Sequence, residues 1–90
     1  MALIRPIPTS ATTIKCILPV TNSTTLPDTK YAYAIVSGVD LSPTLSLNGT
    51  ALTASESSID GSNNLRTFEI GVLQTGDVLS PYGKCALFYI

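Results

Sequence analysis

The sequence has 90 residues, a formal net charge of −1 and only 12% charged residues, where an average soluble domain has roughly 25%. Its five basic residues are scattered singly and no apolar run approaches the roughly 18 residues of a membrane span, so we expect neither a nucleic-acid partner nor a membrane. A chain of this length forms one domain, near the size at which partner chains often supplement the core.

The composition favours strands over helices. Ser and Thr together contribute twenty-two residues, and the branched side chain of Thr packs well on a pleated sheet. No stretch carries apolar residues at helical spacing for three turns, whereas alternation with a period of two recurs along the chain. We therefore expect an all-β domain with almost no helix.

The amino-terminal residues combine apolar side chains with two prolines. Pro6 and Pro8 each lack a backbone donor and fix φ at about −65°, so this segment is extended but unsuited to pairing inside its own sheet. Burial of Leu3, Ile4 and Ile7 would contribute on the order of 1.5–3 kcal/mol each, and the prolines reduce the entropy lost on docking.

We divide the chain into an extended docking arm over residues 1–10 and a single β-sandwich domain over residues 11–90. An exposed arm is ordinarily polar, because Leu and Ile gain nothing from contact with water. This arm is apolar, so docking onto another protein chain is the favoured interpretation. The alternative is that the arm folds back across its own sandwich and covers an edge strand.

Residues 12–20, TTIKCILPV, alternate as a half-buried strand does. The two faces of this strand would carry Ile14, Cys16, Leu18 and Val20 on one side, and Thr13, Lys15 and Ile17 on the other. Pro19 marks the edge or the end of the strand, because proline cannot donate to a ladder.

A second strand is predicted within residues 30–36, KYAYAIV, after a polar loop rich in turn residues. Tyr31, Tyr33 and Ile35 alternate there with small residues. We expect these three side chains to pack on the core face, with the tyrosine hydroxyls at its rim.

A hairpin is predicted over residues 44–53, TLSLNGTALT, where two short apolar arms flank Asn48 and Gly49. This pair most readily adopts the positive φ angles of a type I′ turn. Residues 53–64 show no apolar alternation, so we expect them to form an exposed loop, the longest in the domain.

Two strands are predicted in the last third of the chain, separated by a turn over residues 74–80 with Gly76 at its centre. The first, within residues 64–73, has Arg66, Phe68 and Ile70 on one face and Leu65, Thr67 and Glu69 on the other. The second, residues 84–90, has two apolar faces: Ala86, Phe88 and Ile90, and Cys85, Leu87 and Tyr89. Only one of these two faces can point into so small a core.

Six or seven short strands with frequent turn signals indicate a small antiparallel β-sandwich or jelly-roll-like barrel, preceded by the extended arm. Cys16 and Cys85 lie in apolar strand-like segments and lack the close spacing of a zinc site. Two buried free thiols are favoured over a disulfide. The first and last strands of a sandwich often neighbour each other, which leaves a bridge geometrically possible.

The reactive side chains give no indication of catalysis. Histidine is absent, which removes the commonest general base and the commonest metal ligand. The six acidic residues are spread one per loop or strand, and neither cysteine has a base to activate it. We therefore predict that the protein is not an enzyme and uses no cofactor and no metal. At Asp60, a plain Asx-type turn is favoured over a calcium loop.

Three segments carry a resemblance to a known family: the arm ALIRPIPTS, the hairpin SLNGTAL, and LQTGDVL before the last strand. The chain resembles the head decoration, or cement, proteins of tailed bacteriophages. That resemblance implies a non-enzymatic virion protein, made in the host cytoplasm, which binds the capsid surface and clamps adjacent subunits of the major capsid protein. It also implies a homo-oligomer, with a trimer favoured over a dimer.

The side chains predicted to bind partners are those of the apolar ends and of one tyrosine in a turn: Leu3, Ile4, Pro6, Ile7, Pro8, Tyr82, Leu87 and Tyr89. The alternative function is a carbohydrate- or receptor-binding β-sandwich module of a phage tail or spike. In that case Tyr31, Tyr33 or Tyr82 would serve as a stacking platform, because exposed aromatic rings stack on sugars.

Overall fold

The computed structural model describes residues 13–59 and 62–90. In these ranges the chain is all-β and forms eight strands, where six or seven were expected. The strands are β1 (Lys15–Ile17), β2 (Ala32–Val39), β3 (Thr44–Leu47), β4 (Thr50–Ala51), β5 (Glu56–Ile59), β6 (Asn63–Glu69), β7 (Leu79–Tyr82) and β8 (Lys84–Tyr89). The same ranges contain no helix with the length and apolar character needed to cross a membrane.

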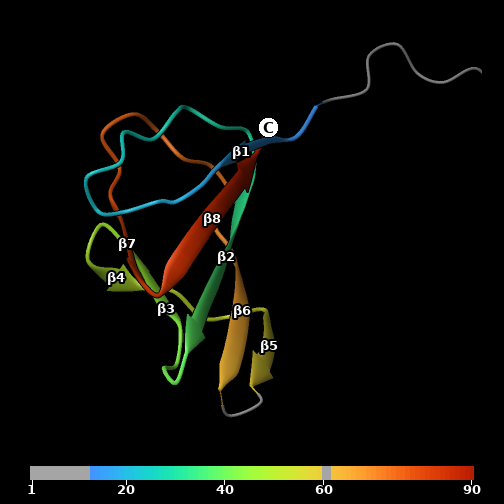
Figure 1. The fold of residues 1–90 in the computed structure, drawn as a ribbon. Helices are drawn as coiled ribbons and strands as arrows, with labels where there is room; N and C mark the ends of the chain where they lie inside the picture. Colours follow the sequence, from blue (N-terminus) through green and yellow to red (C-terminus); the bar gives the residue numbers. More distant parts are fainter. Residues whose placement is uncertain (1–12, 60–61) are drawn as a thin grey trace, which may run out of the picture.

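The strands form two antiparallel sheets (Figure 1). The larger sheet has five strands in the order β1-β8-β2-β6-β5, and the smaller has three in the order β4-β3-β7. Side chains from both sheets and from two loops build one core: Val20, Leu26, Ala32, Ala34, Val36, Leu45, Phe68, Leu73, Leu79, Cys85 and Leu87. The fold is therefore two layers with apolar side chains between them.

The loops over residues 18–31 and 70–78 extend the smaller layer, bringing Val20, Leu26 and Leu73 into the core. Thr29 joins the two loops. Its backbone N–H donates to the Leu73 carbonyl (2.9 Å), and its hydroxyl oxygen accepts from the Leu73 N–H (2.8 Å). These bonds satisfy backbone groups that would otherwise be buried without partners.

The face of β2 that was expected to point inward points outward. Tyr33 and Ile35 lie on the far side of the sheet from the core, and Tyr31, just before the strand, is 40% exposed. The inward side chains of β2 are the small ones: Ala32, Ala34 and Val36. The two layers are only about 10 Å apart. The smaller layer fills that space with leucine side chains, so small side chains fit opposite them.

The faces of β1 are also inverted relative to the expectation. Cys16 pairs with Phe88 and Ile17 with Leu87, which places Ile17 against the core and leaves Cys16 exposed. Ile14 and Leu18 are exposed as well, and of their set only Val20 is buried. The strand ends ahead of Pro19, as predicted.

Both cysteines are free, as predicted, but only Cys85 is buried. Their strands, β1 and β8, are neighbours. The two side chains nevertheless point to opposite faces of the sheet, since Cys16 shares a face with Phe88 and Cys85 shares one with Leu87. A disulfide between them is incompatible with this register.

The predicted hairpin is confirmed. β3 and β4 pair antiparallel around Asn48 and Gly49, whose φ angles are 51° and 83°. The side chain of Asn48 bridges to the turn around Gly76: its amide donates to the Asp77 carboxylate (3.0 Å) and its oxygen accepts from the Val78 N–H (2.9 Å). The turn around Gly76 was also predicted, and these hydrogen bonds hold it against the hairpin.

The segment expected to be the longest exposed loop contains β5, which was missed. β5 pairs with the first part of β6, with Glu56 opposite Thr67 and Ser58 opposite Leu65. Both Glu56 and Ser58 are exposed. A strand at the edge of a sheet can be polar on its solvent-facing side, so an alternating apolar pattern need not mark it.

The chain passes from the smaller sheet to the larger one at Gly83, between β7 and β8. Gly83 has a φ of 125°, and a Cβ there would lie 2.6 Å from the Ser37 backbone oxygen. Only glycine fits this corner without displacing the backbone. Tyr82, expected in a turn, is instead the last residue of β7, and its side chain is 59% exposed.

Candidate interaction surface

The outer face of the larger sheet, the face turned away from the core, carries an apolar strip. The strip consists of Phe88, Tyr33, Ile35, Leu65 and Val39. Residues paired across antiparallel strands project to the same face, so the register fixes its make-up. One row across the sheet is Cys16, Phe88, Tyr33 and Glu69; the next is Ala86, Ile35, Thr67 and Glu56; the third is Lys84, Ser37, Leu65 and Ser58. No described strand lies over these rows, which belong to one layer of a two-layer fold.

An aromatic pocket occupies one end of this outer face. Tyr33 and Phe88 are stacked with ring centroids 5.1 Å apart, and Tyr31 lies tilted against Tyr33 at 6.3 Å. The pocket has a volume of about 310 Å³, and its walls are these three rings together with Ile14, Tyr89 and Ile90. Stacked and tilted ring pairs are individually favourable, so the pocket walls are held in place by their own contacts.

The carboxylate of Glu69 lies at the edge of the aromatic pocket. Partial burial raises the pKa of the Tyr31 hydroxyl, and the negative charge of Glu69 and its hydrogen bond with that hydroxyl raise it further. Glu69 also pairs with Tyr33 in the register of β2 and β6. The pocket is therefore apolar with a single anionic side chain at its margin.

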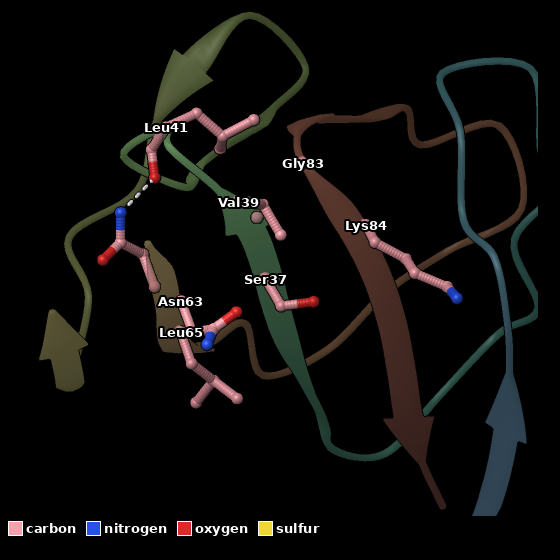
Figure 2. A pocket seen from close by; sticks show the side chains of 9 residues that line it. Ser37, Val39, Leu41, Asn63, Leu65, Gly83 and Lys84 are labelled. Carbon is pink, nitrogen blue, oxygen red and sulfur yellow. Dashed lines mark hydrogen bonds between the residues drawn. The ribbon is translucent and has the colours of Figure 1, made fainter. Parts of the chain in front are cut away.

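A second pocket, of about 390 Å³, lies at the opposite end of β2 (Figure 2). Val39, Leu41 and Leu65 give it apolar walls, and the side chain of Lys84 points away from them. The side-chain amide of Asn64 donates to the Leu41 carbonyl (2.6 Å), drawn as the dashed line in Figure 2, and holds the loop after β2 against β6. Apolar side chains therefore lie at both ends of the outer face and are linked by Ile35 and Leu65, while Ser37 and Lys84 are the polar neighbours of Leu65 in the third row.

The partner-binding residues predicted from the sequence fall in different places. Leu3, Ile4, Pro6, Ile7, Pro8 and the arm over residues 1–10 lie outside the described residues. Leu87 is fully buried in the core, so its side chain is not part of the surface. Tyr89 is half-buried; it packs against the core and also lines the aromatic pocket. Tyr82 is exposed on the smaller sheet, away from that pocket.

Sequence reasoning named Tyr89 as a partner-binding residue and Tyr31 and Tyr33 only for the alternative function, and it missed Phe88 and Ile14. The signal was present in β8, where both faces were recognised as apolar and one of them had to remain outside the core. The face of β8 that lies outward carries Ala86 and Phe88. Combined with the Tyr33 and Phe88 pairing, that surplus face would have located the pocket, but the pairing depends on strand order, which the sequence does not specify.

The arrangement is suited to binding an apolar partner. In the described ranges, no three His, Cys, Asp or Glu side chains come together as a group that could hold a metal ion. Burial raises the pKa of the Cys85 thiol to about 11, which keeps it protonated at neutral pH.

Comparisons with protein-family models, with curated proteins and with solved structures found no match for this chain.

Proposed function

We propose that this protein is a non-enzymatic virion component that binds the outside of a bacteriophage capsid and cements adjacent capsid subunits. In this proposal residues 1–10 are a docking arm and residues 11–90 form a small sandwich of the jelly-roll type. Its partners are the major capsid protein and further copies of itself, as a trimer rather than a dimer. The protein is made in the host cytoplasm and acts on the capsid surface.

The observation that carries this proposal is the aromatic pocket on the outer face, over which no described strand lies. Soluble monomers rarely expose contiguous apolar patches, and those that do commonly use them to bind other proteins. Here Tyr33, Phe88 and Ile14 form such a patch, and Ile35 and Leu65 continue it along the sheet. Aromatic side chains are also the type that dominates the energetics of protein interfaces.

A clamp between neighbouring subunits needs at least two contact surfaces. The aromatic pocket lies on the larger sheet, and the exposed ring of Tyr82 lies on the smaller one. The apolar arm adds a third contact in this proposal. Each contact supplies only a modest free energy, but copies repeated over a shell bind together through multivalency, so weak single contacts are sufficient.

Deletion of residues 1–9 tests this proposal. We expect the truncated protein to keep its fold, because the described core draws its side chains from residues 17–89, and to lose binding to expanded capsids in a co-sedimentation assay. The matched control is Val72→Ser, which removes an exposed apolar side chain from a loop outside both surfaces and should leave capsid binding unchanged. Capsid binding that survives the truncation would contradict the proposal.

One observation favours the alternative of a carbohydrate- or receptor-binding module of a tail or spike. Sugar sites combine a stacking ring with a polar group at its edge, and Glu69 lies beside Tyr31 and Tyr33. The cement proposal predicts that a glycan array shows no binding. A glycan that binds the wild-type protein and Tyr82→Ala, but not Tyr33→Ala, would favour the alternative.

A further inference from the structure

We infer that the aromatic pocket binds residues 2–8 of a second copy of this chain. This inference rests on the proposed cementing function and deepens it, because it assigns the aromatic pocket and the arm to contacts between copies on the shell and leaves the exposed ring of Tyr82 to contact the capsid. Copies on adjacent capsid subunits would then be tied to one another by their arms. The same contact would produce the homo-oligomer in solution.

The arm leaves the described part of the chain at the rim of this pocket. Ile14, one residue after the described range begins, is itself a pocket wall. The carboxyl-terminal Ile90 lies at the same end of the sheet, where its N–H donates to the Tyr31 carbonyl (3.0 Å) and its carbonyl accepts from the Lys30 N–H (2.8 Å) (Figure 1). An arm that starts at this end of one copy can therefore reach the pocket of a neighbouring copy, whether the copies are arranged as a pair or as a ring.

The length of the segment matches the length of the apolar strip. From Tyr33 to Val39 the outer face extends over six residue steps, about 20 Å at the rise of a β-strand. Residues 2–8, with prolines at 6 and 8, favour an extended conformation in which seven residues span about 19 Å. An arm of this size covers the strip without excess.

The charges are complementary as well. Arg5 is the only charged side chain in residues 1–12. The outer face carries Glu69 beside the rings and Glu56 in the next row, while its cation Lys84 lies in the third row, toward the far end. Lys84 lies on β8, on one side of β2, whereas Glu69 and Glu56 lie on β6 and β5, on the other side, so an arm that lies over β2 and β6 would carry Arg5 on the side of the two carboxylates.

A second copy is favoured over the chain's own arm by the direction of β1. β1 and β2 start at the same end of the sheet, because both are antiparallel to β8, and the strip runs from that end toward Val39. A chain's own arm would have to reverse direction through residues 9–12, TSAT, which contain one common turn residue, Ser10, but no Gly or Asn to adopt the positive φ angles of the tightest turns. An arm from another copy needs no reversal.

The oligomeric state of the full chain, measured by sedimentation velocity, tests this inference. We expect the wild type to self-associate, and Ile7→Asp to weaken association at least tenfold because a charge replaces a buried apolar anchor. Ser10→Asp is the matched control, since it places the same charge outside residues 2–8, and it should associate as the wild type does. A monomeric wild type, or equal effects of the two variants, would overturn the inference.

A charge swap then distinguishes a second copy from the chain's own arm. Arg5→Glu and Glu69→Arg should each weaken self-association about two- to fivefold, as expected for a partly exposed ion pair. In an equimolar mixture of these two variants, every arm contact between unlike chains regains opposite charges, so mixed oligomers should be stronger than those of either variant alone. A mixture no stronger than either variant alone would overturn the inference.

Two further measurements separate the outcome for this inference from misfolding of a variant and from the outcome for the proposed function. Protection of the Cys85 thiol from a soluble thiol reagent verifies that each variant is folded, because that thiol is inaccessible in the native core. Capsid co-sedimentation is scored independently. Self-association without capsid binding would refute the proposed function alone, and capsid binding by a chain that never self-associates would refute this inference alone.

Discussion

Asp77 joins two turns that are far apart in the sequence. One of its oxygens accepts from the side-chain amide of Asn48 (3.0 Å), and the other accepts from the backbone N–H of Gln74 (2.9 Å). These two hydrogen bonds, with that from Asn48 the larger effect, lower the pKa of Asp77 below its ordinary value of 3.8. The bonds stabilise the ionised carboxylate, so this part of the link between the turn and the hairpin is strongest while Asp77 is charged, whereas the bonds between Asn48 and Val78 do not depend on that charge.

This arrangement predicts an acid-sensitive contribution to stability. The folded protein binds the proton of Asp77 less tightly than the unfolded chain, so the contribution is present above pH 3.8 and is lost as the pH falls toward the lower folded pKa. We expect Asp77→Ala to reduce the free energy of unfolding at pH 7, measured by urea denaturation. The variant should also show a smaller decline in that free energy below pH 3.8 than the wild type does. Asn48→Gly keeps the positive φ accessible and should be strongly non-additive with Asp77→Ala. Additive effects would contradict a direct link.

Single side chains could be assigned from the sequence where the chemistry is local. Asn48 and Gly49 were placed correctly, because their own φ preferences determine the turn. Tyr33 was placed on the wrong face, because its orientation depends on what the opposite layer brings into the core. The larger side chain was expected inside, yet the limited space between the layers selects alanine.

Among the elements, β6 and β8 were predicted with the correct faces, β2 was predicted with its faces inverted, and of the edge strands of the larger sheet β1 was inverted and β5 was missed. β6 and β8 are flanked on both sides by other strands, and the two faces expected for each of them are confirmed. β1 and β5 are edge strands, with Cys16 exposed on one and Ser58 on the other. Edge strands are often short or polar, which discourages pairing with other chains, and these features weaken the alternation on which prediction relies. The candidate interaction surface is accordingly a sheet face rather than a sheet edge.

The candidate surface arises only from the arrangement of the whole molecule. Its rings come from the start of β2 and the end of β8, segments more than fifty residues apart in sequence. Ile14, which directly precedes β1, forms another wall of the pocket. Periodicity indicated that β8 had a surplus apolar face, but not which strand lay beside it. The existence of a surplus apolar face on β8 could therefore be predicted from the sequence. The position of the aromatic pocket could not, because it depends on strand order.

The stability of the whole molecule should fall at alkaline pH because of one core thiol. Cys85 is fully buried beside Val36 and Leu87, and burial raises its pKa from 9.0 to about 11. The folded protein holds this proton more tightly than the unfolded chain, so the stabilisation is complete below pH 9.0 and is lost as the pH rises to about 11. We expect a loss on the order of 2–3 kcal/mol in the free energy of unfolding across this range.

Urea denaturation under reducing conditions, from pH 8 to 11, measures this loss. Cys85→Ala should start from a lower stability, because it leaves a small cavity, but should lack this part of the alkaline decline. Cys16→Ser should decline as the wild type does, because that thiol is exposed in the folded protein. Tyr31→Phe accounts for the tyrosine whose raised pKa acts in the same direction. An equal decline in Cys85→Ala and wild type would show that the core thiol does not set the alkaline limit of this fold.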